Sequence, residues 1–130
     1  MSITLTGWAI MAIIGLIMAG LFALWKFMRL TVKEIRRKAG EKLAIEGGKK
    51  WMMMRLKDIA KGDTSANTKT MAELDRLADE EGHEYATALF DENGEIIGDI
   101  ELTEKTDRNA TDSPEVQKLF RNGQPLIVEK

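Results

Sequence analysis

The longest apolar segment of the chain lies at its N-terminus. No charged residue precedes Lys26, and the sequence from Ile3 to Trp25 is almost entirely apolar. A helix needs about 20 apolar residues to cross a hydrocarbon core of about 30 Å. The pattern therefore predicts a transmembrane anchor over residues 1–30, with Trp8 and Trp25 at the two membrane–water interfaces.

Small residues recur along this predicted helix at steps of three and four. The spacing places Ala12, Gly15, Ala19 and Ala23 on one face. A face of small residues lets a second helix approach closely, so we expect helix packing here, against a copy of the chain or another membrane subunit. The alternative is that the stripe reflects only the ordinary abundance of Gly and Ala in spans.

Residues 31–61 alternate apolar and basic positions at helical spacing, which predicts a basic amphipathic helical stem that continues the anchor. Adjacent glycines disfavour a helix, so Gly47-Gly48 predicts a hinge within the stem. After the hinge, Met52, Leu56 and Ile59 share one helical face. This face suits either the membrane interface or a partner protein.

Charge is strongly separated along the chain. Residues 26–61 hold 12 Lys/Arg against 4 Asp/Glu, whereas residues 62–130 hold 7 against 17. Basic residues flanking a span stay in the cytoplasm, which predicts an outside N-terminus and a cytoplasmic C-terminal head. We expect membrane lipids as partners and no nucleic acid, because topology already accounts for the basic cluster. The predicted membrane-interface residues are Trp8, Trp25, Lys26, Arg29, Arg36, Arg37, Lys38, Lys49, Lys50, Trp51 and Met52.

A polar linker at 62–69 precedes a predicted acidic head at 70–130. Thr70 and Glu73 form a capping box for a helix over about 71–81. Asn93-Gly94 between two β-rich runs predicts a hairpin. Pro114 opens a second short helix, and residues 126–128 predict a C-terminal strand. The predicted fold class is therefore α+β: one transmembrane helix, a basic helical stem, and a small head with a hairpin, two short helices and a short strand.

Few residues suggest chemistry. The chain has no cysteine and one histidine, His83, so a metal site within a single chain is not expected. Asp91, Asn93 and Glu95 are better explained as a turn than as a calcium loop, because the twelfth-position Glu of such a loop is absent. No nucleophile–base pair or phosphate-binding loop is present. We therefore expect no catalytic, cofactor-binding or metal residues, no cofactor and no enzymatic activity.

The order of elements over about 71–128 is similar to part of a PAS or Cache-like sensor domain. The similarity rests on Phe90-Asp-Glu-Asn-Gly-Glu-Ile-Ile and on the helix of residues 113–123. It implies a sensing or signalling role, and no ligand-binding residue carries over from it.

Two functions remain open from the sequence. The first is a single-pass membrane-anchored accessory subunit that stabilises a larger assembly through helix packing and its head. The second is a signalling or sensor module. An accessory subunit should expose an apolar contact surface, whereas a sensor should contain a sizeable apolar pocket.

Overall fold

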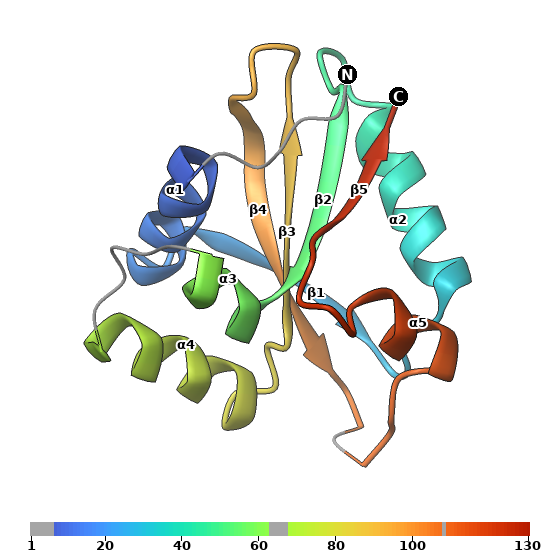
Figure 1. Ribbon diagram of the computed structural model, residues 1–130. Helices are drawn as coiled ribbons and strands as arrows, with labels where there is room; N and C mark the ends of the chain where they lie inside the picture. Colours follow the sequence, from blue (N-terminus) through green and yellow to red (C-terminus); the bar gives the residue numbers. More distant parts are fainter. Residues whose placement is uncertain (1–6, 63–67, 108) are drawn as a thin grey trace.

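The computed structural model describes residues 7–62, 68–107 and 109–130. They form a five-stranded mixed sheet with helices on both faces: α1, α3 and α4 cover one face, and α2 and α5 cover the other (Figure 1). Strand order is β1-β4-β3-β2-β5; β1 is parallel to β4, and the other neighbours are antiparallel. The elements are α1 (Gly7–Met18), β1 (Phe22–Phe27), α2 (Val32–Leu43), β2 (Lys50–Arg55), α3 (Leu56–Gly62), α4 (Thr68–Asp79), β3 (Tyr85–Phe90), β4 (Ile96–Lys105), α5 (Pro114–Leu119) and β5 (Leu126–Glu129).

The predicted transmembrane anchor is wrong. The apolar segment is divided by a turn at Gly20, whose φ of 73° is accessible to glycine at little cost, into helix α1 and strand β1. With 12 residues, α1 is about 18 Å long, short of the roughly 30 Å hydrocarbon core. None of the helices in the described ranges combines the length and apolar character needed to cross a membrane. The single-pass topology, with its outside N-terminus and cytoplasmic head, is overturned with the anchor.

The predicted stem is also wrong as a continuation of an anchor, although its first half is helical. Helix α2 begins after Thr31, whose hydroxyl oxygen accepts a hydrogen bond from the Glu34 N–H, and its residues Ile35, Ala39 and Leu43 are buried. Strand β1 separates α2 from α1, so the two helices are not one rod.

Residues 49–61 do not form the expected interfacial helix. They form β2 and α3, and Trp51 is only 1% exposed. At the glycine pair the chain turns between α2 and β2: Gly47 has a φ of 86°, and the Gly48 N–H donates to the Ile45 carbonyl.

The elements predicted in the C-terminal half are present. Helix α4, the β3–β4 hairpin, α5 and β5 lie close to their expected positions. In the hairpin turn, Asp91 Oδ1 accepts hydrogen bonds from the N–H groups of Asn93 and Glu95, and Gly94 has a φ of 79°. The same sheet also includes β1 and β2, which come from the segments expected to form the anchor and stem. Residues 1–6, the N-terminal flank of the predicted anchor, and 63–67, most of the predicted linker, lie outside the described residues.

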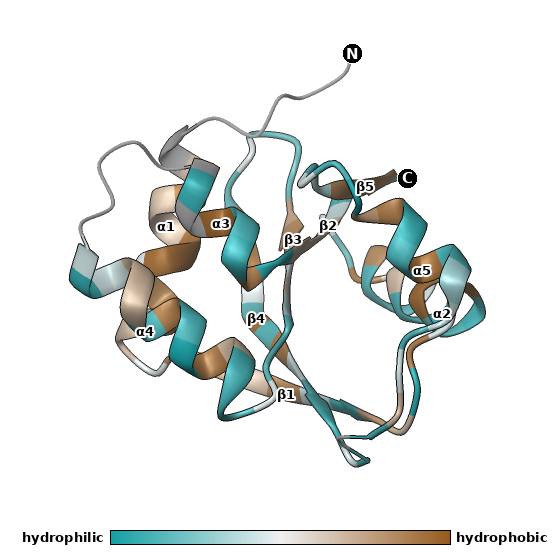
Figure 2. Ribbon diagram, turned by 60° about the horizontal axis from the view of Figure 1, so that its bottom comes forward, coloured by the Kyte–Doolittle hydropathy of each residue, from teal (hydrophilic) through white to brown (hydrophobic). Residues whose placement is uncertain are grey.

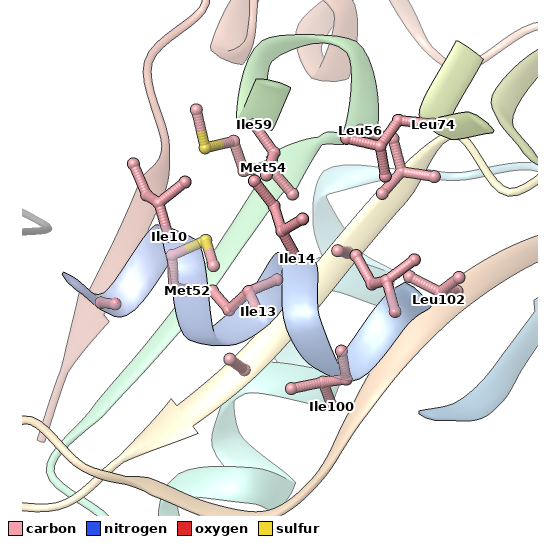
Figure 3. Close-up of a cluster of buried hydrophobic side chains, with 14 of the residues drawn as sticks. Ile10, Ile13, Ile14, Met52, Met54, Leu56, Ile59, Leu74, Ile100 and Leu102 are labelled. Atoms are coloured by element: carbon pink, nitrogen blue, oxygen red, sulfur yellow. The ribbon is translucent and has the colours of Figure 1, made fainter. Parts of the chain in front are cut away.

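The sheet separates two apolar cores. Side chains alternate between the faces of a strand, so Met52 and Met54 face α1 whereas Trp51 and Met53 face α2. On the α1 side, isoleucines of the helix pack over β2 and β4 (Figure 3). That cluster includes Ile10, Ile13, Ile14, Met52, Met54, Leu56, Ile59, Leu74, Ile100 and Leu102.

Candidate functional site

The side of α1 that faces away from the sheet is apolar and exposed. Every residue from Gly7 to Met18 is apolar. The inner side of the helix is buried through Ile10, Ile13, Ile14 and Ile17. We call the outward side the α1 outer face; its residues are Met11, Ala12, Gly15 and Met18, together with Ala19, which directly follows the helix. Met11 is 48% and Met18 42% exposed, and Ala12 is half-buried. A helix that is apolar all round is usually buried all round, which makes this face a candidate contact surface.

Three of the four predicted helix-packing residues lie together on this face. Gly15 and Ala19 are exposed, Ala12 is half-buried beside them, and nothing apart from the local helix backbone and the chain neighbours lies within 4 Å of where a Gly15 Cβ would be. Ala23 is separated from them because it belongs to β1. Ala12, Gly15 and Ala19 therefore lie on one side of a helix that packs on a sheet, and packing of this side against a second helix stays a prediction.

A groove continues this surface at the C-terminal end of α1. It has a volume of about 660 Å³ and is lined by Ile17, Met18 and Phe22 on one side and by Glu73 and Leu77 of α4 on another. Figure 2 shows brown and pale tones over the labelled part of α1, next to α4 with its alternating brown and teal segments. Leu21, 60% exposed, extends the apolar area past the end of the helix.

Strand β1 leaves one edge of the sheet open. Among the described strands it pairs only with β4, from Phe22 opposite Ile100 to Phe27 opposite Lys105. Leu24 and Met28, on and just after the strand, are exposed. An open edge with apolar side chains is a common place for protein contacts.

The residues predicted at a membrane interface do not act together in the structure. Trp25, Trp51 and Met52 are buried in the two cores. Lys38 and Lys42 of α2 flank the buried Glu101 of β4, with the Lys38 Nζ 2.9 Å from its Oε2. The Lys38 ammonium also lies 5.3 Å from the centre of the Trp25 ring.

The other predicted interface residues are distributed among separate ion pairs and exposed positions. Arg37 pairs with Glu34 and Glu41 along α2, and Lys50 pairs with Glu129 across β2 and β5. Lys26 Nζ lies 3.9 Å from a Glu104 carboxylate oxygen. Arg29, Arg36 and Lys49 are exposed, and Trp8 lies in α1 with its side chain outside the described part.

A buried polar cluster joins β3, β4 and the start of α5. Tyr85 Oη donates to Asp112 Oδ2 at 2.7 Å, and Lys105 Nζ lies 2.8 Å from Glu84 Oε1 and 3.5 Å from Asp112 Oδ1. Burial, together with the bond to Asp112, raises the pKa of the Tyr85 phenol above its usual value. Burial opposes the charge of Lys105, but the ion pairs with Glu84 and Asp112 outweigh it and raise the pKa of the ammonium.

This cluster lines a cleft of about 460 Å³ with Arg55 and Arg121 near it. Because its hydrogen bonds and ion pairs join segments up to 27 residues apart, no local motif reveals it in the sequence. The Tyr85 phenol and the Lys105 ammonium both contact Asp112, and these contacts hold the residues before α5 against the sheet.

His83 has a structural contact. Its Nδ1 donates to the Thr103 carbonyl at 3.0 Å, and its ring makes a T-shaped contact with the Phe22 ring, with the ring centres 6.2 Å apart. Within the ranges that the structure describes, no three His, Cys, Asp or Glu side chains are placed to hold a metal ion. Comparison of the chain with protein-family models, with curated proteins and with solved structures found no match.

Proposed function

We propose that this protein works by binding, as an assembly module that self-associates through the α1 outer face. The observation that carries the proposal is that α1 has no polar residue on the side facing away from the core. Removing apolar surface from water is favourable by about 25 cal/mol per Å², so a second surface that covers this face gains free energy. Exposed apolar contact area supports an accessory, structural role over a sensing one.

The α1 outer face is complementary to itself. If two copies of α1 cross in antiparallel fashion at Gly15, Met11 of one copy lies opposite Ala19 of the other, and Ala12 lies opposite Met18. Each large side chain then meets a small one, and the two helices approach closely at the glycines. A two-fold contact of this kind closes on itself and gives a dimer. Because α1 carries no charge, the two copies do not repel each other across it.

The proposal is tested by sedimentation of the full chain over a range of concentrations. We expect a monomer–dimer equilibrium in the wild type. Gly15→Leu should weaken dimerisation at least tenfold, because the side chain fills the point of closest approach. Gly40→Leu is a matched control: Gly40 also lies within an exposed helical face with no atom within 4 Å of its Cβ position, but on α2. The control should dimerise like the wild type.

Two outcomes would contradict the proposal. One is a wild-type protein that remains monomeric at all concentrations. The other is equal weakening by Gly15→Leu and Gly40→Leu, which would place the contact elsewhere. If the monomeric wild type instead co-sediments with phospholipid vesicles, and Gly15→Leu does not, the α1 outer face binds lipid and the dimer is rejected.

A further inference from the structure

The pairing of β3 with β4 contains a pronounced irregularity. Thr87 lies opposite Glu101 and Leu89 opposite Ile97, so two steps along β3 correspond to four along β4. The additional residues bulge outward at Gly98, whose φ is 67°, and Asp99, and both are exposed. Bulges of this kind redirect side chains and are frequent beside functional sites.

A small cavity of about 80 Å³ lies beside this bulge, between the sheet and the C-terminal end of α2. Lys42, Trp51, Thr87 and Glu101 are among the residues that line it, and the exposed Ile45 and Asp99 stand at its border. The cavity lies on the side of the sheet opposite α1, so it is separate from the proposed dimer contact.

Two buried side chains of this cavity have polar atoms without a hydrogen bond in the described protein. Trp51 Nε1 has no acceptor, and Glu101 Oε1 has no donor in hydrogen-bond geometry, although Lys42 Nζ lies 3.1 Å from it. Trp51 is 1% and Glu101 5% exposed. Buried polar groups in proteins are nearly always hydrogen-bonded. An unpaired indole donor beside a carboxylate oxygen whose contact with Lys42 lacks hydrogen-bond geometry therefore indicates a ligand able to satisfy both.

We propose that this cavity binds a small uncharged molecule carrying a hydroxyl or a primary amide. Such a group accepts from the Trp51 indole N–H and donates to Glu101 Oε1 at the same time. A cation is disfavoured by the indole N–H and by the ammonium groups of Lys38 and Lys42. An anion is disfavoured by the buried Glu101 carboxylate. Because a water molecule occupies about 30 Å³ in the liquid, a cavity of about 80 Å³ has the volume of two to three waters and suits only a very small organic molecule.

The test uses nitrogen-15 NMR spectra of the full wild-type chain, with acetamide as the probe. The indole N–H signals are assigned in the wild-type chain, from their nuclear Overhauser contacts with neighbouring side chains. Acetamide should shift the Trp51 indole signal along a saturating curve, and the Trp25 signal, which belongs to a side chain outside the cavity, should stay in place. Acetone is the matched probe, because it has a similar size and an acceptor oxygen but no donor for Glu101. It should bind at least several-fold more weakly than acetamide.

Three results would overturn the proposal. The first is no shift of the Trp51 indole signal with acetamide. The second is a linear shift, or equal shifts with acetone or at Trp25, which would reveal a general solvent effect. The third is a long-lived water seen next to the Trp51 indole that acetamide does not displace, because the cavity would then be a structural water site. All three are read on the wild-type protein, so they do not depend on whether a variant folds.

Discussion

Helices α1 and α2 have the same length, 12 residues, and pack on opposite faces of one sheet (Figure 1), yet their outward sides differ completely. The outward side of α2 carries Arg37 in ion pairs with Glu34 and Glu41, and Thr31 caps its N-terminus. The outward side of α1 carries methionine, alanine and glycine. The outward side of α2 is polar and suited to contact with water, whereas the outward side of α1 leaves apolar surface exposed.

The difference explains why the N-terminal segment resembles a membrane span. Mean hydropathy sums both sides of a helix, and α1 is apolar on the side that packs on β2 and β4 as well as on the side that is exposed. An apolar helix followed by a largely apolar strand has the same composition as a span. What separates the two structures is the glycine turn at Gly20 and the pairing of β1 with β4.

The largest expected effect tests the packing of both helices against the sheet. Ile13 of α1 and Ile35 of α2 are both almost fully buried against the sheet. Truncating a buried isoleucine to alanine costs about 2–5 kcal/mol through lost transfer free energy and the cavity left behind. Ile13→Ala and Ile35→Ala should therefore lower the free energy of unfolding in urea by similar amounts. A loss below about 1 kcal/mol for Ile13→Ala alone would contradict the packing of α1 on the sheet.

Local signals in the sequence predicted the C-terminal half well. The Asn93-Gly94 turn and Pro114 act within a few residues, and a hairpin or short helix depends mainly on such signals. The helix predicted from the capping box is present, but Thr70 lies within α4 and not before it, so the predicted cap itself is wrong. The N-terminal half depends on partners distant in sequence: β1 pairs with β4 about 78 residues later, as Phe22 with Ile100. Trp51 and the three methionines after it are all buried, on alternating faces of an internal strand. The segment is therefore continuously apolar, and such a run fits a helical face as well as it fits a strand. A strand buried on both faces has no period of two to detect.

The candidate site was partly predictable for the same reason. The small-residue spacing identified Ala12, Gly15 and Ala19, because helical periodicity is local. The cavity beside Trp51 and Glu101 was not predictable, because it depends on a bulge and on four elements, α2, β2, β3 and β4, meeting. The Tyr85–Asp112 bond likewise needs the folded sheet.

The next effect tests the polar groups on the α2 and α5 side of the sheet. The folded state raises the pKa of Tyr85 above its unfolded value of about 10, so the phenol's contribution to stability is present below pH about 10 and is lost as the pH rises further. The free energy of unfolding should fall by at most about 1.4 kcal/mol per pH unit from this group. Tyr85 is the single tyrosine of the chain, so near-ultraviolet absorbance of tyrosinate follows it directly.

Tyr85→Phe is the control for this titration. It should reduce the slope above pH about 10 without removing it, because the pKa of Lys105 is also raised and its stabilising charge is lost over the same alkaline range. Tyrosinate that forms at the ordinary pH of an exposed phenol, while the protein stays folded, would contradict the burial of the Tyr85–Asp112 pair.

A smaller effect tests the N-terminal cap of α2. The Thr31 hydroxyl oxygen accepts from the Glu34 N–H at 3.2 Å and caps the helix. Thr31→Ala should cost about 1 kcal/mol of stability, whereas Thr31→Ser should keep most of it, because the hydroxyl remains. Thermal unfolding of the three proteins at one concentration measures the difference. Equal losses in both variants would show that the methyl group of Thr31, not its hydrogen bond, stabilises the helix.

The smallest effect separates the two outer faces themselves. Gly15 and Gly40 both lie inside a helix with free space around the Cβ position, so alanine at either site should raise the monomer's stability by about 0.5–1 kcal/mol. At low protein concentration the two gains should match. At high concentration dimerisation adds to apparent stability by mass action, and an added methyl group at the closest approach of two α1 helices weakens that contribution. The advantage of Gly15→Ala should therefore shrink or reverse as concentration rises, while that of Gly40→Ala stays constant. If the two variants gain equal stability at every concentration, the outer face of α1 does not take part in association, and the proposed dimer contact is wrong.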